Sequence, residues 1–242
     1  MIASILFGRR GSRGLPGKNT RVVLGMPLAA YPLKACRDSG LVDAMFVSTD
    51  DPEIVKIGRE WGADHLERPP HLCADDALLE EAIHDAFLRV RSLHEGLRIV
   101  VITQCNAPYV NGPLVREAIT ILQRDPGIDS VITAIRLDGF APERARTVDG
   151  QGNLVPYVPF EKFGREVTCD RSSQLPVYFF DSALTVVRAR CLHDLQNNML
   201  PFRWMGQRIK FIEQPANPGD IDFEWQLPIV EHWLQDMLEN GD

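Results

Sequence analysis

The chain is 242 residues long, with 45% hydrophobic residues, 24% charged residues and a formal net charge of −7. This size and composition are ordinary for a globular protein, so we expect residues 1–242 to form a single domain. The negative charge argues against a nucleic-acid surface, and no apolar run approaches the roughly 20 residues that span a bilayer. Five scattered cysteines without a CxxC pair, and no basic segment ahead of the first apolar run, favour a cytoplasmic protein with free thiols.

Strands and helices alternate through the first 135 residues. Short apolar runs predict strands at 2–7, 44–49, 98–103 and 130–135. Amphipathic runs, most of them opened by proline, predict the helices between them, with Asp50 or Asp51 capping the second and Asp75 or Asp76 the third. These helices are expected at 27–38, 52–61, 77–93 and 113–124. The alternation indicates an α/β fold with a mostly parallel, Rossmann-like sheet flanked by helices.

Residues 137–176 interrupt this alternation. Their short runs, several prolines and turn signals at Asp149-Gly150 and Gly152-Asn153 are typical of an antiparallel excursion. Because such an arm commonly contacts a partner subunit, we expect it to mediate a homodimer. After it, the pattern predicts extended segments at 177–188 and 209–212 and a closing helix at 224–238.

The loop after the first strand concentrates glycine and positive charge. Residues 8–19 contain four glycines and four cations, and residues 1–37 carry seven cations and no acid. Backbone amides in a glycine-rich loop, flanked by Arg and Lys, form an anion cradle. A positive region in an acidic protein suits a small anionic ligand. The loop therefore predicts a site for the polyphosphate of a nucleoside triphosphate.

Two familiar phosphate loops fit less well. A Walker A loop would need glycine in place of Ser12 and serine or threonine in place of Asn19. A dinucleotide fingerprint needs GxGxxG, whereas Gly11, Gly14 and Gly17 are spaced by threes. A solvated basic loop is the remaining alternative, and the mutual repulsion of neighbouring cations disfavours it.

Polar residues elsewhere could complete such a site. Asp220 and Asp222 are two residues apart, so on an extended segment both carboxylates face one side. Paired carboxylates and substrate phosphates are the usual ligands of Mg²⁺. Asp222 could instead cap the closing helix. Gln104 and Asn106 follow a strand at the edge where open α/β sheets bind ligands, and their amides could orient an acceptor.

These motifs together resemble the cytidylyltransferases that activate sugar acids, which are the CMP-sialic acid synthetases with the CMP-Kdo synthetases as a more distant branch. The similarity begins in the loop at 8–19 and in Gly25-Met26-Pro27-Leu28. It continues through Val47-Ser48-Thr49-Asp50-Asp51-Pro52-Glu53-Ile54, Arg68-Pro69 with Leu72, Ala74 and Asp75, Gln104 with Pro108, and Asp220-Ile221-Asp222.

The resemblance implies a nucleotide-diphospho-sugar transferase fold and the transfer of CMP from CTP, with release of pyrophosphate. Arg9, Arg13 and Lys18 would then be the catalytic cations. Nucleotide binding would fall to Gly11, Ser12, Asn19 and, at the base, Arg68. Mg²⁺ would be held by Asp220 and Asp222.

The acceptor is less constrained than the donor. The residues expected to bind it are Arg10, Gln104, Asn106 and Arg171. Three positions depart from the family pattern: Arg10 replaces a small residue, Asn106 matches neither branch, and Asp181-Ser182-Ala183 replaces Asn-Gly-Ala. Both a sialic-like nonulosonic acid and a small phosphonate stay open, because relatives in phosphonate pathways also form CMP conjugates.

Two other classes of function fit the sequence less well. A nucleotide-sugar-dependent glycosyltransferase would need an internal DxD at a central strand end, but the DxD of this chain is late, at Asp220 to Asp222. A non-enzymatic nucleotide sensor would not need the carboxylate pair.

Overall fold

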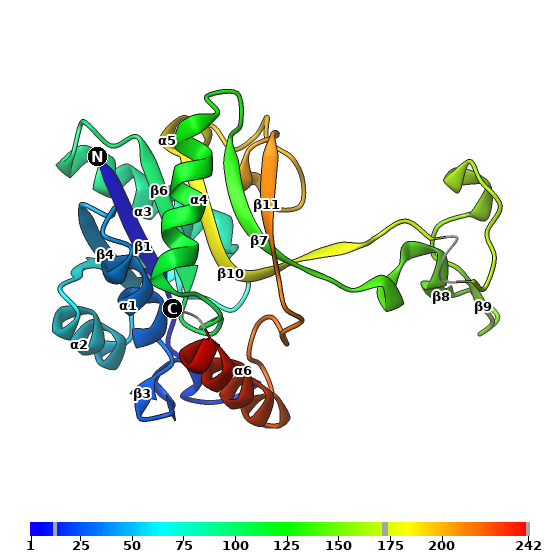
Figure 1. Ribbon diagram of the computed structural model, residues 1–242, viewed down its shortest axis with the longest axis horizontal. Coiled ribbons are helices and arrows are strands. Elements are labelled where there is room, and N and C mark those ends of the chain that lie inside the picture. The colour runs from blue at the N-terminus through cyan, green and yellow to red at the C-terminus, as the bar shows by residue number, and fades with distance from the viewer. Residues whose placement is uncertain (12–13, 171–173, 241–242) are drawn as a thin grey trace.

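The computed structural model describes residues 1–11, 14–170 and 174–240. Its centre is a seven-stranded sheet in the order β11-β7-β10-β6-β1-β4-β5 (Figure 1). All of these strands run parallel except β10, which pairs antiparallel with both β6 and β7. The mostly parallel sheet expected from the sequence is confirmed. Its strands are β1 (Ile2–Phe7), β4 (Ala44–Thr49), β5 (Asp64–Glu67), β6 (Ile99–Gln104), β7 (Ser130–Arg136), β10 (Tyr178–Arg188) and β11 (Ile209–Gln214).

Helices cover both faces of the sheet. Successive side chains of a strand point to opposite faces, so Ile5 and Phe7 pack in one apolar cluster and Leu6 packs in another. The cluster on the Ile5 face includes α3 (Leu79–Leu93) and α5 (Ala189–His193). The opposite face is covered by α1 (Ala30–Asp38), α2 (Pro52–Glu60) and α4 (Gly112–Arg124).

Three local predictions were wrong. The first helix begins at Ala30, because Met26–Pro27 (β3) pairs with Val22–Val23 (β2) in a small hairpin. β5 lies in the segment expected to be a connection, where Leu66 alone among its residues is buried. α3 begins at Leu79 without a side-chain cap, so neither Asp75 nor Asp76 caps it. The cap at α2 was correct, since the Asp51 carboxylate accepts a hydrogen bond from the Glu53 amide.

The excursion predicted from the turn signals is an arm that projects from the sheet (Figure 1). It leaves after β7 and returns at the start of β10, where the Leu137 amide donates to the carbonyl of Val177. Its outer part is an antiparallel hairpin of β8 (Arg146–Val148) and β9 (Leu154–Pro156). Asp149 closes the turn by accepting hydrogen bonds from the amides of residues 151 and 153.

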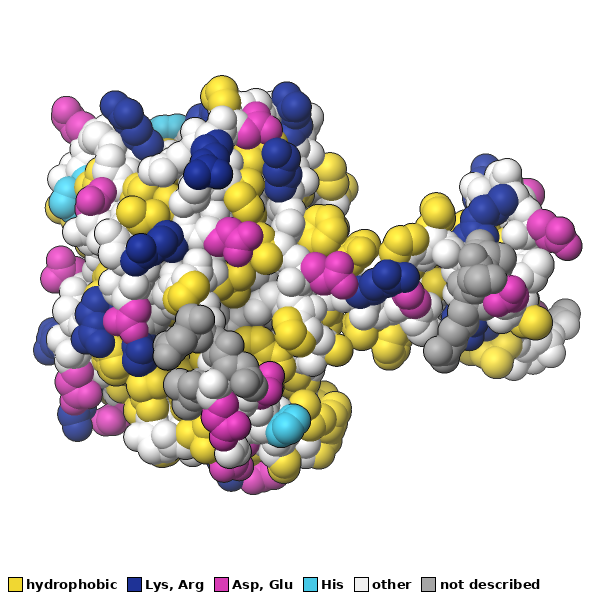
Figure 2. Space-filling model, in the orientation of Figure 1, with side chains coloured by type: hydrophobic (Ala, Val, Ile, Leu, Met, Phe, Trp, Pro, Cys, Tyr) yellow, Lys and Arg dark blue, Asp and Glu magenta, His cyan; other side chains and the backbone are white. Residues whose placement is uncertain are grey.

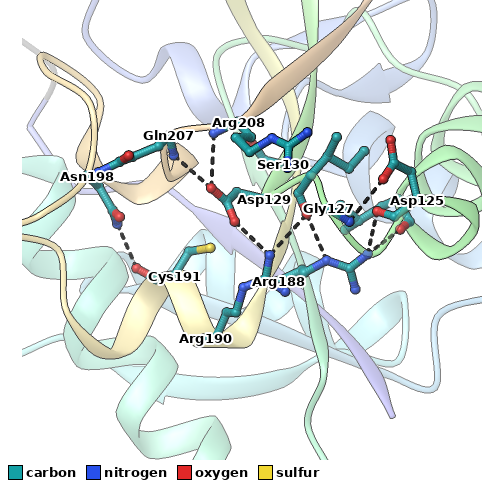
Figure 3. Close-up of polar contacts among 12 residues, drawn as sticks. Asp125, Gly127, Asp129, Ser130, Arg188, Arg190, Cys191, Asn198, Gln207 and Arg208 are labelled. Carbon is teal, nitrogen blue, oxygen red and sulfur yellow. Dashed lines mark hydrogen bonds and ion pairs between the residues drawn. The ribbon is translucent and has the colours of Figure 1, made fainter.

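A polar cluster ties together the end of the sheet at which the parallel strands begin (Figure 3). The Asp129 carboxylate accepts hydrogen bonds from the amides of Gln207 and Arg208, and it forms an ion pair with Arg190 at 2.7 Å. The Arg188 guanidinium donates to the carbonyl of Leu122 in the last turn of α4 and to those of Asp125 and Ile128 beyond it. The parallel strands finish at the opposite end of the sheet.

That opposite end is covered by the C-terminal helix, α6 (Leu227–Asn240), which follows the 3-10 turn Glu224–Gln226. Val230 and Leu234 of α6 pack with Leu15 of the glycine loop and with Ile221. Residues 215–226 are thereby held against the loop. Among the described residues, no helix combines the length and apolar character needed to cross a membrane.

Candidate active site

A cavity of about 360 Å³ opens where β1 and β6 end. Phe7 and Gly8 at the end of β1 and Gln104 at the end of β6 form part of its wall, which is the edge at which parallel α/β sheets bind ligands. It brings together residues that lie up to 215 positions apart in the chain. Seven of the site residues predicted from sequence line it: Arg9, Lys18, Asn19, Arg68, Gln104, Asn106 and Asp222.

Hydrogen bonds attach the glycine loop to the body. The buried Asn19 donates from Nδ2 to the carbonyl of Arg9 at 3.2 Å, which ties the two ends of the loop together. The Arg10 amide donates to the Asp50 carboxylate at 2.8 Å, so Asp50 anchors the loop and does not cap α2. Gly14 approaches the Asp222 segment so closely that a Cβ there would lie 2.4 Å from the Asp222 carbonyl oxygen.

Carboxylates from distant segments face the loop cations. Lys18, only 9% exposed, places Nζ 2.6 Å from Oδ1 of Asp222. Arg9 pairs with Asp75 at 2.7 Å and also donates to the carbonyl of Cys73. The positive field inferred from residues 1–37 is therefore partly balanced in the fold, and Asp75 acts as an ion-pair partner in place of the predicted helix cap.

Arg68 is a buried cation in the cavity wall. Its Nη2 donates to the Ser48 carbonyl at 2.7 Å, and its guanidinium lies 5.8 Å from the centre of the Phe7 ring. Burial lowers its pKa from the usual value, although a guanidinium stays charged at physiological pH. Arg68 thus offers a positioned cation in the same wall as Leu72.

The two late carboxylates have different surroundings. Asp220 is partly buried, and its Oδ1 is shielded from solvent with no hydrogen-bond partner among the described residues. Burial, followed by the charge of Asp222, raises the pKa of Asp220. Asp222 is exposed and does not cap the closing helix, because the Gln226 side chain accepts from the amides of Asp222 and Phe223 in that role.

A divalent cation fits this pair. It would satisfy the orphaned oxygen of Asp220 and reduce the repulsion between the two carboxylates. Within the described part of the chain, no group of three or more His, Cys, Asp or Glu side chains is arranged to hold a metal. The pair would therefore share the ion with phosphate oxygens and water, which is how Mg²⁺ is commonly bound.

The other predicted residues lie elsewhere. Arg10 and Gly11 are exposed and do not line the cavity, and the partly buried Asp220 does not line it either. Ser12, Arg13 and Arg171 lie outside the described residues. Sequence reasoning missed part of the wall, namely Leu78, Leu79 and Ala82 at the start of α3. Their apolar spacing signalled only a helix, so no pattern in the sequence marked them as part of a site.

Known proteins are similar to this chain over regions that form the cavity. Residues 3–141 match the sequence profile of a family described as cytidylyltransferase. N-acylneuraminate cytidylyltransferase A of Danio rerio is 30% identical over 139 residues, which are 57% of this chain and 31% of that protein. CMP-N,N'-diacetyllegionaminic acid synthase of Legionella pneumophila is 26% identical over 190 residues, 78% of each protein.

Solved structures extend the similarity of fold to nearly the whole chain. A CMP:2-keto-3-deoxy-manno-octonic acid synthetase, solved in complex with CTP, superposes with a TM-score of 0.67 at 16% identity, covering 97% of this chain and 98% of that one. The chain spans about a third of the length of the N-acylneuraminate cytidylyltransferases of Danio rerio and Oncorhynchus mykiss, 31% in each case.

Proposed function

The chain belongs to the cytidylyltransferase family, and from this premise we propose that it transfers CMP from CTP to a small anionic acceptor and releases pyrophosphate. The observation that carries the proposal is the meeting of Lys18 with Asp222 in the cavity, 2.6 Å apart across 204 positions of sequence. Lys18 can bind the polyphosphate of a nucleotide, and the neighbouring Asp222 can bind the metal ion that accompanies it.

The chemistry needs no nucleophile from the protein. An oxygen of the acceptor attacks the α-phosphorus of CTP, a new P–O bond forms, and the bond to the bridging oxygen breaks as pyrophosphate leaves. Arg9, Lys18 and the loop amides neutralise the charge that builds on the leaving group. Arg13, which the family motif assigns to the same task, would add to them.

The acceptor side of the cavity is formed by amides. Gln104 and Asn106 line it at the end of β6 and can donate hydrogen bonds to acceptor oxygens. Because they lie next to the phosphate loop, these amides would orient an acceptor so that its oxygen attacks the α-phosphorus opposite the leaving pyrophosphate.

Asp220 and Asp222 would hold Mg²⁺ together with phosphate oxygens. When bound, the ion would offset the negative charge of the triphosphate. Mg²⁺ bound there would compete with Lys18 for the Asp222 carboxylate, which would leave Nζ of Lys18 available to the phosphates. The orphaned oxygen of Asp220 supports this assignment.

A nonulosonic acid is the acceptor that we propose first. The Legionella relative named for such a sugar acid matches 78% of the chain. Of the departures that kept a phosphonate open, Asp181 is buried and Arg10 is exposed, and neither lines the cavity. Asn106 does line the cavity, so a small phosphonate stays the second candidate on the strength of that residue.

We also propose that the arm mediates a homodimer. The segment joining it to the body carries hydrophobic side chains on its surface (Figure 2). Phe140 is 69% exposed and Phe179 41%, with their rings in edge contact at 6.3 Å. Leu154, Tyr157 and Leu175 are exposed farther along. An apolar surface of this kind on a projecting segment is typical of a protein interface.

The proposed reaction is tested by incubating the protein with CTP, Mg²⁺ and a panel of nonulosonic acids, Kdo and small phosphonates. Pyrophosphate release and the mass of the CMP conjugate are measured, with ATP, GTP and UTP as control donors. We expect conjugate formation with CTP and a nonulosonic acid. If no member of the panel releases pyrophosphate, the proposed reaction is wrong.

One substitution separates an enzyme from a nucleotide sensor. Asp222→Ala should abolish turnover and leave CTP binding measurable by calorimetry, since the loop and Arg68 remain. A variant with normal turnover would remove the carboxylate pair from the reaction.

A further inference from the structure

One buried side-chain amide binds the backbone of the segment that carries the two late carboxylates. Gln226 is the last residue of the 3-10 turn Glu224–Gln226, is 5% exposed and does not line the cavity. A side-chain amide can accept two hydrogen bonds and donate two. Gln226 makes all four, and every one of them goes to the backbone of residues 218–223.

The four hydrogen bonds reach both proposed metal ligands. Oε1 of Gln226 accepts from the amide of Asp222 at 2.7 Å and from that of Phe223 at 2.8 Å. Nε2 donates to the carbonyl of Asp220 at 2.9 Å and to that of Pro218 at 3.3 Å. One side chain therefore holds the backbone of Asp222 with its oxygen and the backbone of Asp220 with its nitrogen.

The residues between and before these ligands are held by the body of the fold. The Ile221 amide donates to the carbonyl of Asn106 at 3.0 Å, and the Ile221 side chain is fully buried. Asn217 accepts from the Gly219 amide at 3.0 Å and donates to the buried carboxylate of Asp181 at 3.2 Å. With residues 219 and 221 fixed in this way, the buried amide determines how the peptide groups of the metal ligands are turned.

Capping of the closing helix accounts for only half of these contacts. The free backbone groups at the start of a helix are N–H groups, so a cap needs an acceptor. Glutamate serves at this position of a capping box as well as glutamine does. The two hydrogen bonds that Gln226 donates go to the carbonyls of Pro218 and Asp220, which precede the helix. They hold the carboxylate segment and add nothing to the cap.

We propose that Gln226 is a positioning residue that sets the relative orientation of the Asp220 and Asp222 carboxylates by binding the backbone of both. The inference rests on the proposed cytidylyl transfer, in which these carboxylates hold Mg²⁺, and it adds the group that keeps them in place. Groups that hold metal ligands by hydrogen bonds commonly change metal affinity by about 10–100-fold when they are removed.

Three substitutions test this role. Gln226→Met keeps the length of the side chain and removes all four hydrogen bonds. Gln226→Glu keeps the two that are accepted, and with them the cap, but cannot donate to the carbonyls. Gln235→Met is the control, because it makes the same change on α6 at an exposed position outside the cavity lining, where the side chain donates to Glu239.

The decisive measurement is the affinity of Mn²⁺ for the protein–CTP complex without acceptor, followed by water proton relaxation. We expect Gln226→Met to bind Mn²⁺ about 10–100-fold more weakly than wild type. Gln226→Glu should bind it about three- to tenfold more weakly, the range for one or two lost hydrogen bonds. Gln235→Met should bind it as wild type does.

Binding of CTP in the presence of EDTA, measured by calorimetry, separates positioning from a general loss of structure. All three variants should bind CTP without metal as wild type does, because neither glutamine lines the cavity. A damaged fold would weaken this binding together with that of Mn²⁺. If Gln226→Met does not fold, Gln226→Glu, which keeps the cap, decides the question.

The role of Gln226 and the proposed function fail on different results. If wild type forms no complex with CTP and Mn²⁺, both fall. If wild type forms it and Gln226→Glu binds Mn²⁺ equally tightly, Gln226 is a helix cap and its positioning role alone is overturned. Equal affinity in Gln226→Met has the same consequence.

Discussion

At the scale of single residues, Lys18 is the cation of the cavity that pairs with a predicted metal ligand. It is nearly buried, and Asp222 is its ion-pair partner. In Lys18→Ala the leaving group loses a cation and the Asp222 carboxylate loses its partner. We expect turnover to fall by about 10²–10³, the effect of removing a comparable charge-stabilising donor, as measured by pyrophosphate release at saturating CTP.

Lys34 supplies the matched control for this substitution. It lies on the exposed side of α1, pairs with Asp38 one turn away, and is outside the cavity lining. Lys34→Ala makes the same change of charge and should leave turnover unchanged. If Lys18→Ala is as active as Lys34→Ala, the loop lysine takes no part in the reaction.

Gly14 tests how closely the loop must approach the Asp222 segment. An alanine Cβ would lie 2.4 Å from the Asp222 carbonyl oxygen, so one backbone must move away from the other. Misplacement of this size can cost about a hundredfold in rate, and we expect kcat of Gly14→Ala to fall accordingly. Gly96→Ala, where a Cβ meets nothing within 4 Å, is the control. Normal kcat in Gly14→Ala would show that this contact is not needed.

At the scale of elements, Asp129 joins the beginnings of β7 and β11 to α5, which follows the end of β10 (Figure 3). Burial acts to raise its pKa, but hydrogen bonds from the amides of Arg208 and Gln207 and from Arg190 outweigh it and hold the pKa at about 2. A carboxyl group in the unfolded chain has a pKa of about 4. Its contribution to stability is therefore present above pH 4 and is lost as the pH falls toward 2.

Asp129→Asn should lower the free energy of unfolding by about 2 kcal/mol at pH 7, because an amide cannot accept all of these hydrogen bonds as a carboxylate does. The difference from wild type should shrink as the pH falls from 4 to 2. Urea unfolding at pH 7, 4 and 3 measures it. Asp64→Asn, at an exposed position of β5, is the control; an Asp129→Asn defect independent of pH would contradict the electrostatic account.

At the scale of the whole molecule, the arm determines whether two copies associate. Phe140→Asp combined with Phe179→Asp places charge on the apolar segment that joins arm and body. We expect wild type to sediment as a dimer and the double variant as a monomer, because buried charges in an apolar interface are costly. A monomeric wild type would remove the assignment of the arm as a dimer interface.

The control for this experiment is a charge of the same kind on the body. Val22 is 62% exposed in β2, away from the arm. Val22→Asp should therefore sediment as wild type does, which separates loss of an interface from a general effect of added charge.

Much of the fold could be predicted because its signals are local. The strands β1 and β4 coincide with the apolar runs that predicted them, since a strand covered on both faces is mostly apolar. β5 was missed because it lies at the edge of the sheet and buries only Leu66. The predicted start of α1 was too early because Pro27 pairs with Val22 in the hairpin of β2 and β3. This pairing depends on the tertiary structure.

The glycine loop, the family and the residue types of the candidate site follow from the sequence itself, because glycine and cation spacing encode them within short segments. Only the tertiary structure decided which of these residues meet. Asp222 pairs with Lys18, and Asp75 pairs with Arg9. Contacts across 66 to 204 positions depend on how strands are ordered in the sheet, and no local pattern specifies that order.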